Sequence, residues 1–233
     1  MTGVFIFDGR SSREFGLYIS GSGTFNAPQR DIETVEIPGR NGTLTIDKKR
    51  FLNIPISYPA FIREKFRAYT DAAREWLLAA PGYRRLEDSY HPEEYRMARF
   101  TGPLDWDTRI LNRSGESTLD FDCMPQRFLK MGEIPHTLTA SGTFVNPTVF
   151  EAKPLFRVYG TSGTLTVGNT AIEISEIEEY IDIDCDTENA YKGTENCNSK
   201  VTPAFPTFPV GQTGVMFSGG IASVTVIPRW WTI

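Results

Sequence analysis

The chain has 233 residues, of which 40% are hydrophobic and 23% charged, and its formal net charge is −5 at pH 7. This composition fits a folded protein of one large or two small domains and argues against extensive disorder. No apolar run approaches the roughly 20 residues of a membrane-spanning helix, and the opening residues lack the basic and apolar regions of a secretory signal. We therefore expect no membrane insertion.

Charged residues are distributed unevenly along the chain. Residues 1–133 contain 19 Lys and Arg against 19 Asp and Glu, whereas residues 134–233 contain 5 against 10. This shift predicts two domains, 1–133 and 134–233. Neither domain has the basic excess of a protein that binds nucleic acid tightly.

The three cysteines are Cys123, Cys185 and Cys197. An odd number without CxxC spacing argues against a disulfide framework and against a zinc site of the usual spacing. We expect reduced thiols, as in proteins made in the cytoplasm, with Cys185–Cys197 as the only plausible local pair.

The stretch IPGRNGTLTID, residues 37–47, has the composition of a phosphate-binding loop. Such a loop needs a lysine and a helix after its second glycine. Here Gly42 is followed by Thr-Leu and by more strand pattern, so a nucleotide site is not expected.

The same stretch predicts a hairpin, because Asn41-Gly42 suits a type I′ turn. Apolar residues alternate with polar ones on both sides of the turn, as in half-buried strands. Pro38-Gly39 interrupts the first strand near its end, which indicates an edge position or a bulge.

A strand is predicted over 51–58. An amphipathic helix of about five turns is predicted to start at Pro59, because apolar residues then recur at spacings of three and four until Pro81-Gly82. Acidic residues lie between its arginines, which indicates a solvated face. Short strands over 83–86, 95–100 and 117–123 complete an α+β domain with one long helix.

The C-terminal part is predicted to be all β. Short strand patterns occur at regular spacing with no helical period, which is typical of a β-sandwich. The expected strands are Leu155–Tyr159, a hairpin over 164–174 with a Gly168-Asn169 turn, Tyr180–Cys185, Val215–Ser218 and Ala222–Pro228.

Three acids alternate in IDIDCDTEN: Asp182, Asp184 and Asp186. A calcium loop of the EF-hand type would need glycine and glutamate where Thr187 and Gly193 stand. We expect the acids on the outer face of a strand, with an ion site as the less favoured interpretation.

No catalytic, cofactor-binding or metal-binding residues are expected. The two histidines, His91 and His136, lie outside any nucleophile or HExxH motif. Carboxylates paired in space for glycoside hydrolysis remain open, because sequence does not reveal such pairing. Trp230-Trp231 could form a sugar-stacking platform, but a strand end packed on the protein is the more common arrangement.

The order of these features resembles the distal tail proteins, often called Dit, of long-tailed bacteriophages with non-contractile tails. The motifs that carry the resemblance span nearly the whole chain. They are an FDG turn at Phe7–Gly9, a GRNGTL hairpin at Gly39–Leu44, a REWLL-type helix ending at Pro81-Gly82, a proline-glutamine junction within Leu119–Leu129, the segments Asn146–Gly160, Ile181–Gly193 and Phe205–Val215, and a final strand reaching Ile227-Pro228-Arg229.

The resemblance implies a structural virion protein and no enzyme. Family members form a six-fold ring at the end of the tail tube. For this chain the resemblance implies a mainly β fold, with a split-barrel-like sheet in the ring-forming N-terminal domain and a galectin-like C-terminal β-sandwich. It also implies a location at the tail tip after assembly in the host cytoplasm.

The partners implied are five other copies in a homo-hexamer, the tail tube protein, a tail-tip or tail-associated lysin-like protein, and receptor-binding or baseplate proteins. DNA would pass through the ring without specific binding. We expect the hairpin residues Arg40, Asn41 and Gly42 at the subunit interface. The alternative function is a carbohydrate-binding host-adhesion module; some relatives carry an inserted module of that kind, for which this chain has no spare length.

Overall fold

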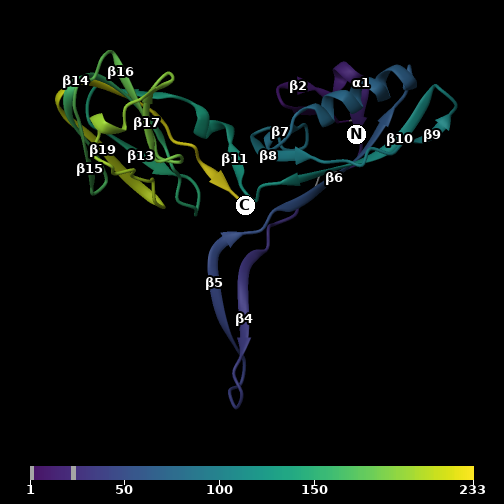
Figure 1. The fold of residues 1–233 in the computed structure, drawn as a ribbon, viewed down its shortest axis with the longest axis horizontal. Helices are drawn as coiled ribbons and strands as arrows, with labels where there is room; N and C mark the ends of the chain where they lie inside the picture. The colour runs from purple at the N-terminus through teal and green to yellow at the C-terminus, as the bar shows by residue number, and fades with distance from the viewer. Residues whose placement is uncertain (1–2, 22–24) are drawn as a thin grey trace. The chain divides into compact units, whose positions relative to one another are not determined.

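The computed structural model describes residues 3–21 and 25–233 (Figure 1). The chain divides into two compact units, residues 1–127 with Ile233 and residues 128–232. Both units are built mainly from β-strands, and the described residues contain one α-helix. The predicted mainly β fold is therefore confirmed. The domain boundary predicted after residue 133 stays a prediction.

The first unit is organised around one antiparallel sheet with the order β2-β1-β7-β8-β10-β6-β3. A short strand, β9 (Asp107–Ile110), pairs with β10 beyond the end of β8. The strands of the sheet are β1 (Phe5–Phe7), β2 (Arg10–Ser11), β3 (Leu17–Ile19), β6 (Ile54–Ile62), β7 (Arg84–Asp88), β8 (Glu94–Phe100) and β10 (Ser114–Cys123).

The helix α1 (Phe66–Ala79) covers the core of this sheet with an apolar face that includes Trp76 and Leu77. The Trp76 ring stacks on Phe15 at 4.3 Å between centroids, and its Nε1 donates a hydrogen bond to the Phe7 carbonyl at 3.2 Å. None of the described helices is long and apolar enough to cross a membrane.

The predicted start of the helix at Pro59 is wrong. Residues 59–62 continue β6, because Tyr58, Ala60 and Ile62 keep the inward alternation and the whole segment pairs with β10. Burial of alternate side chains in the sheet therefore overrides the helical spacing that also fits this segment.

The second unit contains an eight-stranded antiparallel sheet with the order β12-β19-β14-β16-β17-β18, in which β13 also pairs with β19 and β15 with β14. Separately, β11 (Arg127–Leu129) pairs with β20 (Trp231–Thr232). The strands of the sheet are β12 (His136–Leu138), β13 (Gly142–Asn146), β14 (Leu155–Val167), β15 (Thr170–Ile174), β16 (Tyr180–Asp184), β17 (Asn189–Lys192), β18 (Glu195–Asn196) and β19 (Gly211–Ile227).

The two long strands β14 and β19 connect the parts of this sheet that surround its core. The first part of β14 pairs with β16 and its last part with β15, while β19 pairs with β14 along both parts. The register shifts between Gly160 and Gly163, where a side chain on Gly163 would lie 2.1 Å from the Ser218 carbonyl oxygen. Two strands predicted separately, over 215–218 and 222–228, are thus one bent strand, and the predicted Gly168-Asn169 hairpin turn is confirmed because Val167 pairs with Thr170.

The predicted outward placement of the acids is wrong for Asp182 and Asp184, which are 3% and 6% exposed. Asp182 accepts two hydrogen bonds from Arg157, at 2.7 and 2.8 Å, and Asp184 accepts two from Arg229, at 2.6 and 2.9 Å. The guanidinium groups of these bidentate pairs neutralise the buried carboxylates. Among the described residues, no cluster of three or more His, Cys, Asp or Glu could hold a metal ion.

We expect Gly163→Ala to destabilise the protein by about 2 kcal/mol, because the added methyl group must displace the backbone of β19. Thermal unfolding followed by circular dichroism measures the effect. Gly214→Ala is the matched control on the same sheet, since nothing lies within 4 Å of its Cβ position. Equal melting temperatures for the two variants would show that the bend tolerates a side chain.

We expect Asp184→Asn to lower the free energy of unfolding by about 3 kcal/mol at neutral pH, because it leaves Arg229 without its carboxylate. Although burial opposes ionisation, the pKa of Asp184 is held below its usual value by the hydrogen bonds and charge of Arg229. A lowered pKa contributes stability above the unfolded value of about 3.9 and loses it as the pH falls through the folded value.

Urea unfolding at neutral pH and at about pH 2.5 checks this dependence, and the difference between wild type and Asp184→Asn should shrink at the lower pH. Asp186→Asn is the control, because that side chain is 64% exposed. An equal difference at both pH values would contradict the expectation.

Candidate functional site

A separate two-stranded sheet forms the most exposed part of the first unit. It consists of β4 (Arg30–Glu36) and β5 (Thr43–Phe51), which among the described strands pair only with each other (Figure 1). Every residue from 32 to 50 is exposed. We call residues 30–51 the arm. The prediction that its strands are half-buried is wrong, because no second layer from the described residues of the unit covers either face.

The turn of the arm differs from the predicted type I′ turn at Asn41-Gly42. The strands pair as far as Glu36 and Thr43, so the loop comprises residues 37–42. The Arg40 N–H donates to the Ile37 carbonyl at 3.1 Å, and Gly39 has φ +80°. Proline followed by a glycine with positive φ is the signature of a type II turn. Pro38-Gly39 therefore makes the tight turn, and Asn41 does not take the positive φ that a type I′ turn needs.

One face of the arm carries an apolar stripe. Val35 lies opposite Leu44, and Glu33 lies opposite Ile46, so Val35, Leu44 and Ile46 point to the same side. Their side chains are 39%, 42% and 46% exposed. Contiguous apolar side chains on a protruding ribbon are typical of an interaction surface.

Ion pairs hold the base of the arm. Arg30 pairs with Asp47 at 2.7 Å, and Arg50 pairs with Asp31 at 2.7 Å. The Arg50 hydrogen bond lowers the pKa of Asp31, and the backbone N–H of Lys49, with Arg30, lowers the pKa of Asp47. The base is thus fixed by charges of the arm itself.

The tip of the arm contains Arg40, Asn41 and Gly42, the residues that the sequence predicts at an interface. All three are exposed, and Gly42 has φ +82°. The arm's ion pairs lie at its base, and none that the described residues form involves Arg40. Arg40 is therefore free to bind a group outside this arm.

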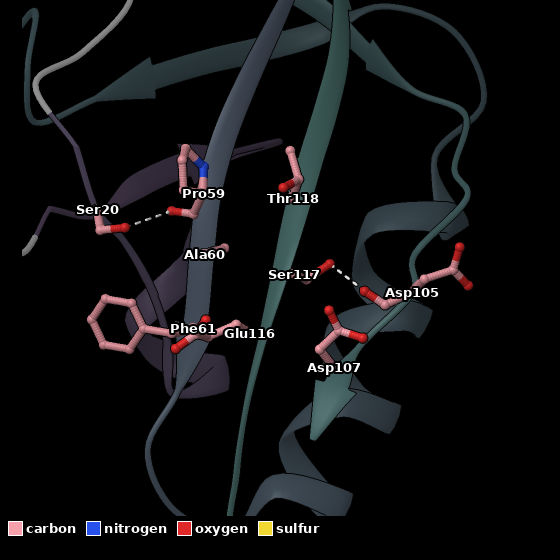
Figure 2. A pocket seen from close by; sticks show the side chains of 9 residues that line it. All are labelled: Ser20, Pro59, Ala60, Phe61, Asp105, Asp107, Glu116, Ser117 and Thr118. Atoms are coloured by element: carbon pink, nitrogen blue, oxygen red, sulfur yellow. Dashed lines mark hydrogen bonds between the residues drawn. The ribbon is translucent and has the colours of Figure 1, made fainter. Parts of the chain in front are cut away.

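A groove of about 410 Å³ lies on the outer side of β6 and β10 (Figure 2). We call it the acidic groove, because three of the residues that line it are acidic: Asp105, Asp107 and Glu116. Figure 2 shows the Asp105 backbone carbonyl facing Ser117 and its carboxylate turned away from the two strands. The Ser117 hydroxyl donates to the Asp105 carbonyl at 2.6 Å and fixes the loop before β9. The other residues that line it are Ser20, Pro59, Ala60, Phe61, Ser117 and Thr118.

Sequence reasoning did not find the acidic groove. Glu116 lies opposite Phe61 in the pairing of β10 with β6, and opposite Asp107 in the pairing of β10 with β9. Only these long-range registers bring the acids together. No local motif could have revealed them.

A buried polar cluster on β6–β8 is structural in character. Asp88 accepts hydrogen bonds from the Tyr58 hydroxyl at 2.6 Å and from two backbone N–H groups, and His91 Nδ1 lies 3.1 Å from it. The cavity beside this cluster measures about 10 Å³, enough for about one water molecule. A substrate has no room here.

The C-terminal tryptophans do not form a shared sugar platform. Trp230 is 4% exposed in the core of the second unit, while Trp231 stacks on Phe150 at 4.5 Å and donates its Nε1 to the Glu151 carbonyl. The predicted packing of this strand end on the protein accounts for both rings.

All three cysteines are free and buried. Burial raises the pKa of Cys123 and of Cys185 to about 12. Such thiols are poor nucleophiles at neutral pH.

No protein-family model matches the chain, and no curated protein sequence matches it either. Solved structures do match it, and two of them are described here. The Dit protein of phage SPP1, described as a paradigm of the hub adsorption apparatus of phages that infect Gram-positive bacteria, has a TM-score of 0.77 at 11% identity, over 99% of this chain and 99% of that chain. A chain of the phage p2 baseplate, in its activated conformation with strontium, has a TM-score of 0.55 at 10% identity, over 97% of this chain and 98% of that chain. At these low identities the matches establish the fold, and the chain therefore has the Dit fold over nearly its whole length.

Proposed function

We propose that this protein is the distal tail hub of a long-tailed phage with a non-contractile tail. The observation that carries the proposal is the end-to-end match to the SPP1 Dit protein, which includes both units and leaves 1% of either chain uncovered. A shared fold alone does not fix function. The exposed arm adds support, because an apolar stripe on a lone ribbon suits a protein that works in an assembly.

The assembly proposed is a homo-hexameric ring. A surface on one copy that binds a different surface on the next copy makes a head-to-tail contact, and such contacts form a ring when the rotation between copies closes. The arm provides one projecting surface per chain. Arg40, Asn41 and Gly42 at its tip are the proposed contact residues.

The ring would join the tail tube protein to a tail-tip or lysin-like protein and to receptor-binding or baseplate proteins. It would assemble in the host cytoplasm and remain at the tail tip of the virion as a structural component. DNA would pass through its centre. The balanced charge of residues 1–133 and the acidic excess of residues 134–233 disfavour tight binding of that DNA.

We expect the purified protein to form a hexamer with about six times the mass of one 26.2 kDa chain. Light scattering coupled to size-exclusion chromatography measures the mass, and electron microscopy of tails labelled for this protein locates it. A strict monomer at high concentration, together with tails that carry no label at their tips, would overturn the proposed function.

We expect Gly42→Val to impair ring formation and to reduce stability by about 1–2 kcal/mol, since a β-branched residue resists a φ of +82°. Gly9→Val is the matched control, because Gly9 has φ +76° and open space around it, but lies in the β1–β2 turn. Both variants should lose stability, whereas only Gly42→Val should lose the ring. Normal assembly of Gly42→Val would remove the tip from the interface.

A further inference from the structure

The apolar stripe of the arm and the free guanidinium of Arg40 both lack a partner within the chain as described. We propose that the arm of one copy lies across the acidic groove of a second copy, with Arg40 between Asp105 and Asp107. This inference rests on the proposed ring and names the two surfaces that meet in it.

Charge complementarity indicates that the groove is the binding site for the tip of the arm. Glu116 already pairs with Arg109 at 2.7 Å. By contrast, no ion pair within the described parts of the chain involves Asp105 or Asp107, and both residues are exposed. The charge of the neighbouring Arg109 acts on Asp107 without forming an ion pair with it. An exposed cation with no ion pair on one surface and two exposed acidic residues with none on another are therefore complementary in charge.

Apolar surface near the groove can cover the stripe. Phe61 and Pro59 form part of the groove wall (Figure 2). At the end of β9, Ile110 and Leu111 are 56% and 83% exposed. Large apolar side chains on both surfaces would be removed from water by one contact, and this burial would supply its main driving force.

The occupant is a second copy because each chain carries both surfaces. No arm residue lines the groove of its own chain. The nine residues of β5 span about 30 Å, which lets the arm reach well beyond the unit that carries it. An arm that binds the groove of the next copy makes a head-to-tail contact, and repetition of this contact closes the ring.

Charge reversal tests the pairing in the full-length protein. Arg40→Glu should weaken ring formation by about tenfold or more, because it places like charges together, and so should the double change Asp105→Lys with Asp107→Lys. The triple variant, which combines all three changes, should regain the ring. Arg67→Glu is the matched control, since it makes the same charge change on the exposed side of α1 and should assemble normally.

Mass photometry over a concentration series measures the hexamer fraction of each variant, and circular dichroism verifies that each is folded. Rings formed by Arg40→Glu as readily as by wild type would overturn the pairing, as would a triple variant that stays dissociated. In either case a wild-type hexamer would leave the proposed function standing. A wild type that forms no ring would overturn both.

Disulfide trapping provides a second measurement, in which each copy changes one charged residue and keeps all its other native charges. Copies with Arg40→Cys are mixed with copies carrying Asp107→Cys and oxidised with diamide, which accepts the two electrons and two protons of the thiols. A crosslinked dimer is expected from the mixture and not from Arg40→Cys alone, because the native cysteines are buried. Absence of a crosslink in mixed hexamers would contradict the proposed contact.

Discussion

A two-stranded ribbon cannot cover its own apolar face, and the contact that we propose between copies depends on this constraint. An isolated pair of strands is marginally stable in water, because it lacks a second layer to bury its side chains. The arm nevertheless presents Val35, Leu44 and Ile46 on one face. The first unit does not need them, since its core is filled by the sheet and α1. An apolar face that the described residues of the chain leave uncovered suits the contact with a second copy that we propose.

The arm and the acidic groove are mechanically connected through β6. At the base of the arm, the Leu52 N–H donates to the Gln29 carbonyl at 2.8 Å, and β6 begins at Ile54. The same strand then supplies Pro59 and Phe61 to the groove. Because β6 pairs with both β10 and β3, the strand that follows the arm in the chain is held in the sheet that carries the groove.

Sequence periodicity predicted the types of the secondary-structure elements better than the burial and the partners of their side chains. The mainly β fold, the single helix and the Gly168-Asn169 turn follow from local patterns. Alternation alone did not reveal that Asp182 is buried, because its partner Arg157 lies on another strand. For the same reason the acidic groove escaped notice: its carboxylates meet only through the pairing of β6, β9 and β10. The exposure of the arm was equally hidden, since alternation predicts an apolar face but not what covers it.

The two kinds of complementarity in the proposed contact have different physical roles. Burial of apolar side chains is non-directional, so the stripe supplies affinity but would tolerate sliding along a neighbouring surface. A charge pair at the tip would fix where the arm lies along the groove, because the electrostatic attraction falls as Arg40 moves away from the carboxylates. Since exposed pairs contribute only about 0–1 kcal/mol of stability each, Arg40 alone would not hold a ring together. It would select the one register in which six identical contacts close, and the apolar stripe would then stabilise that register.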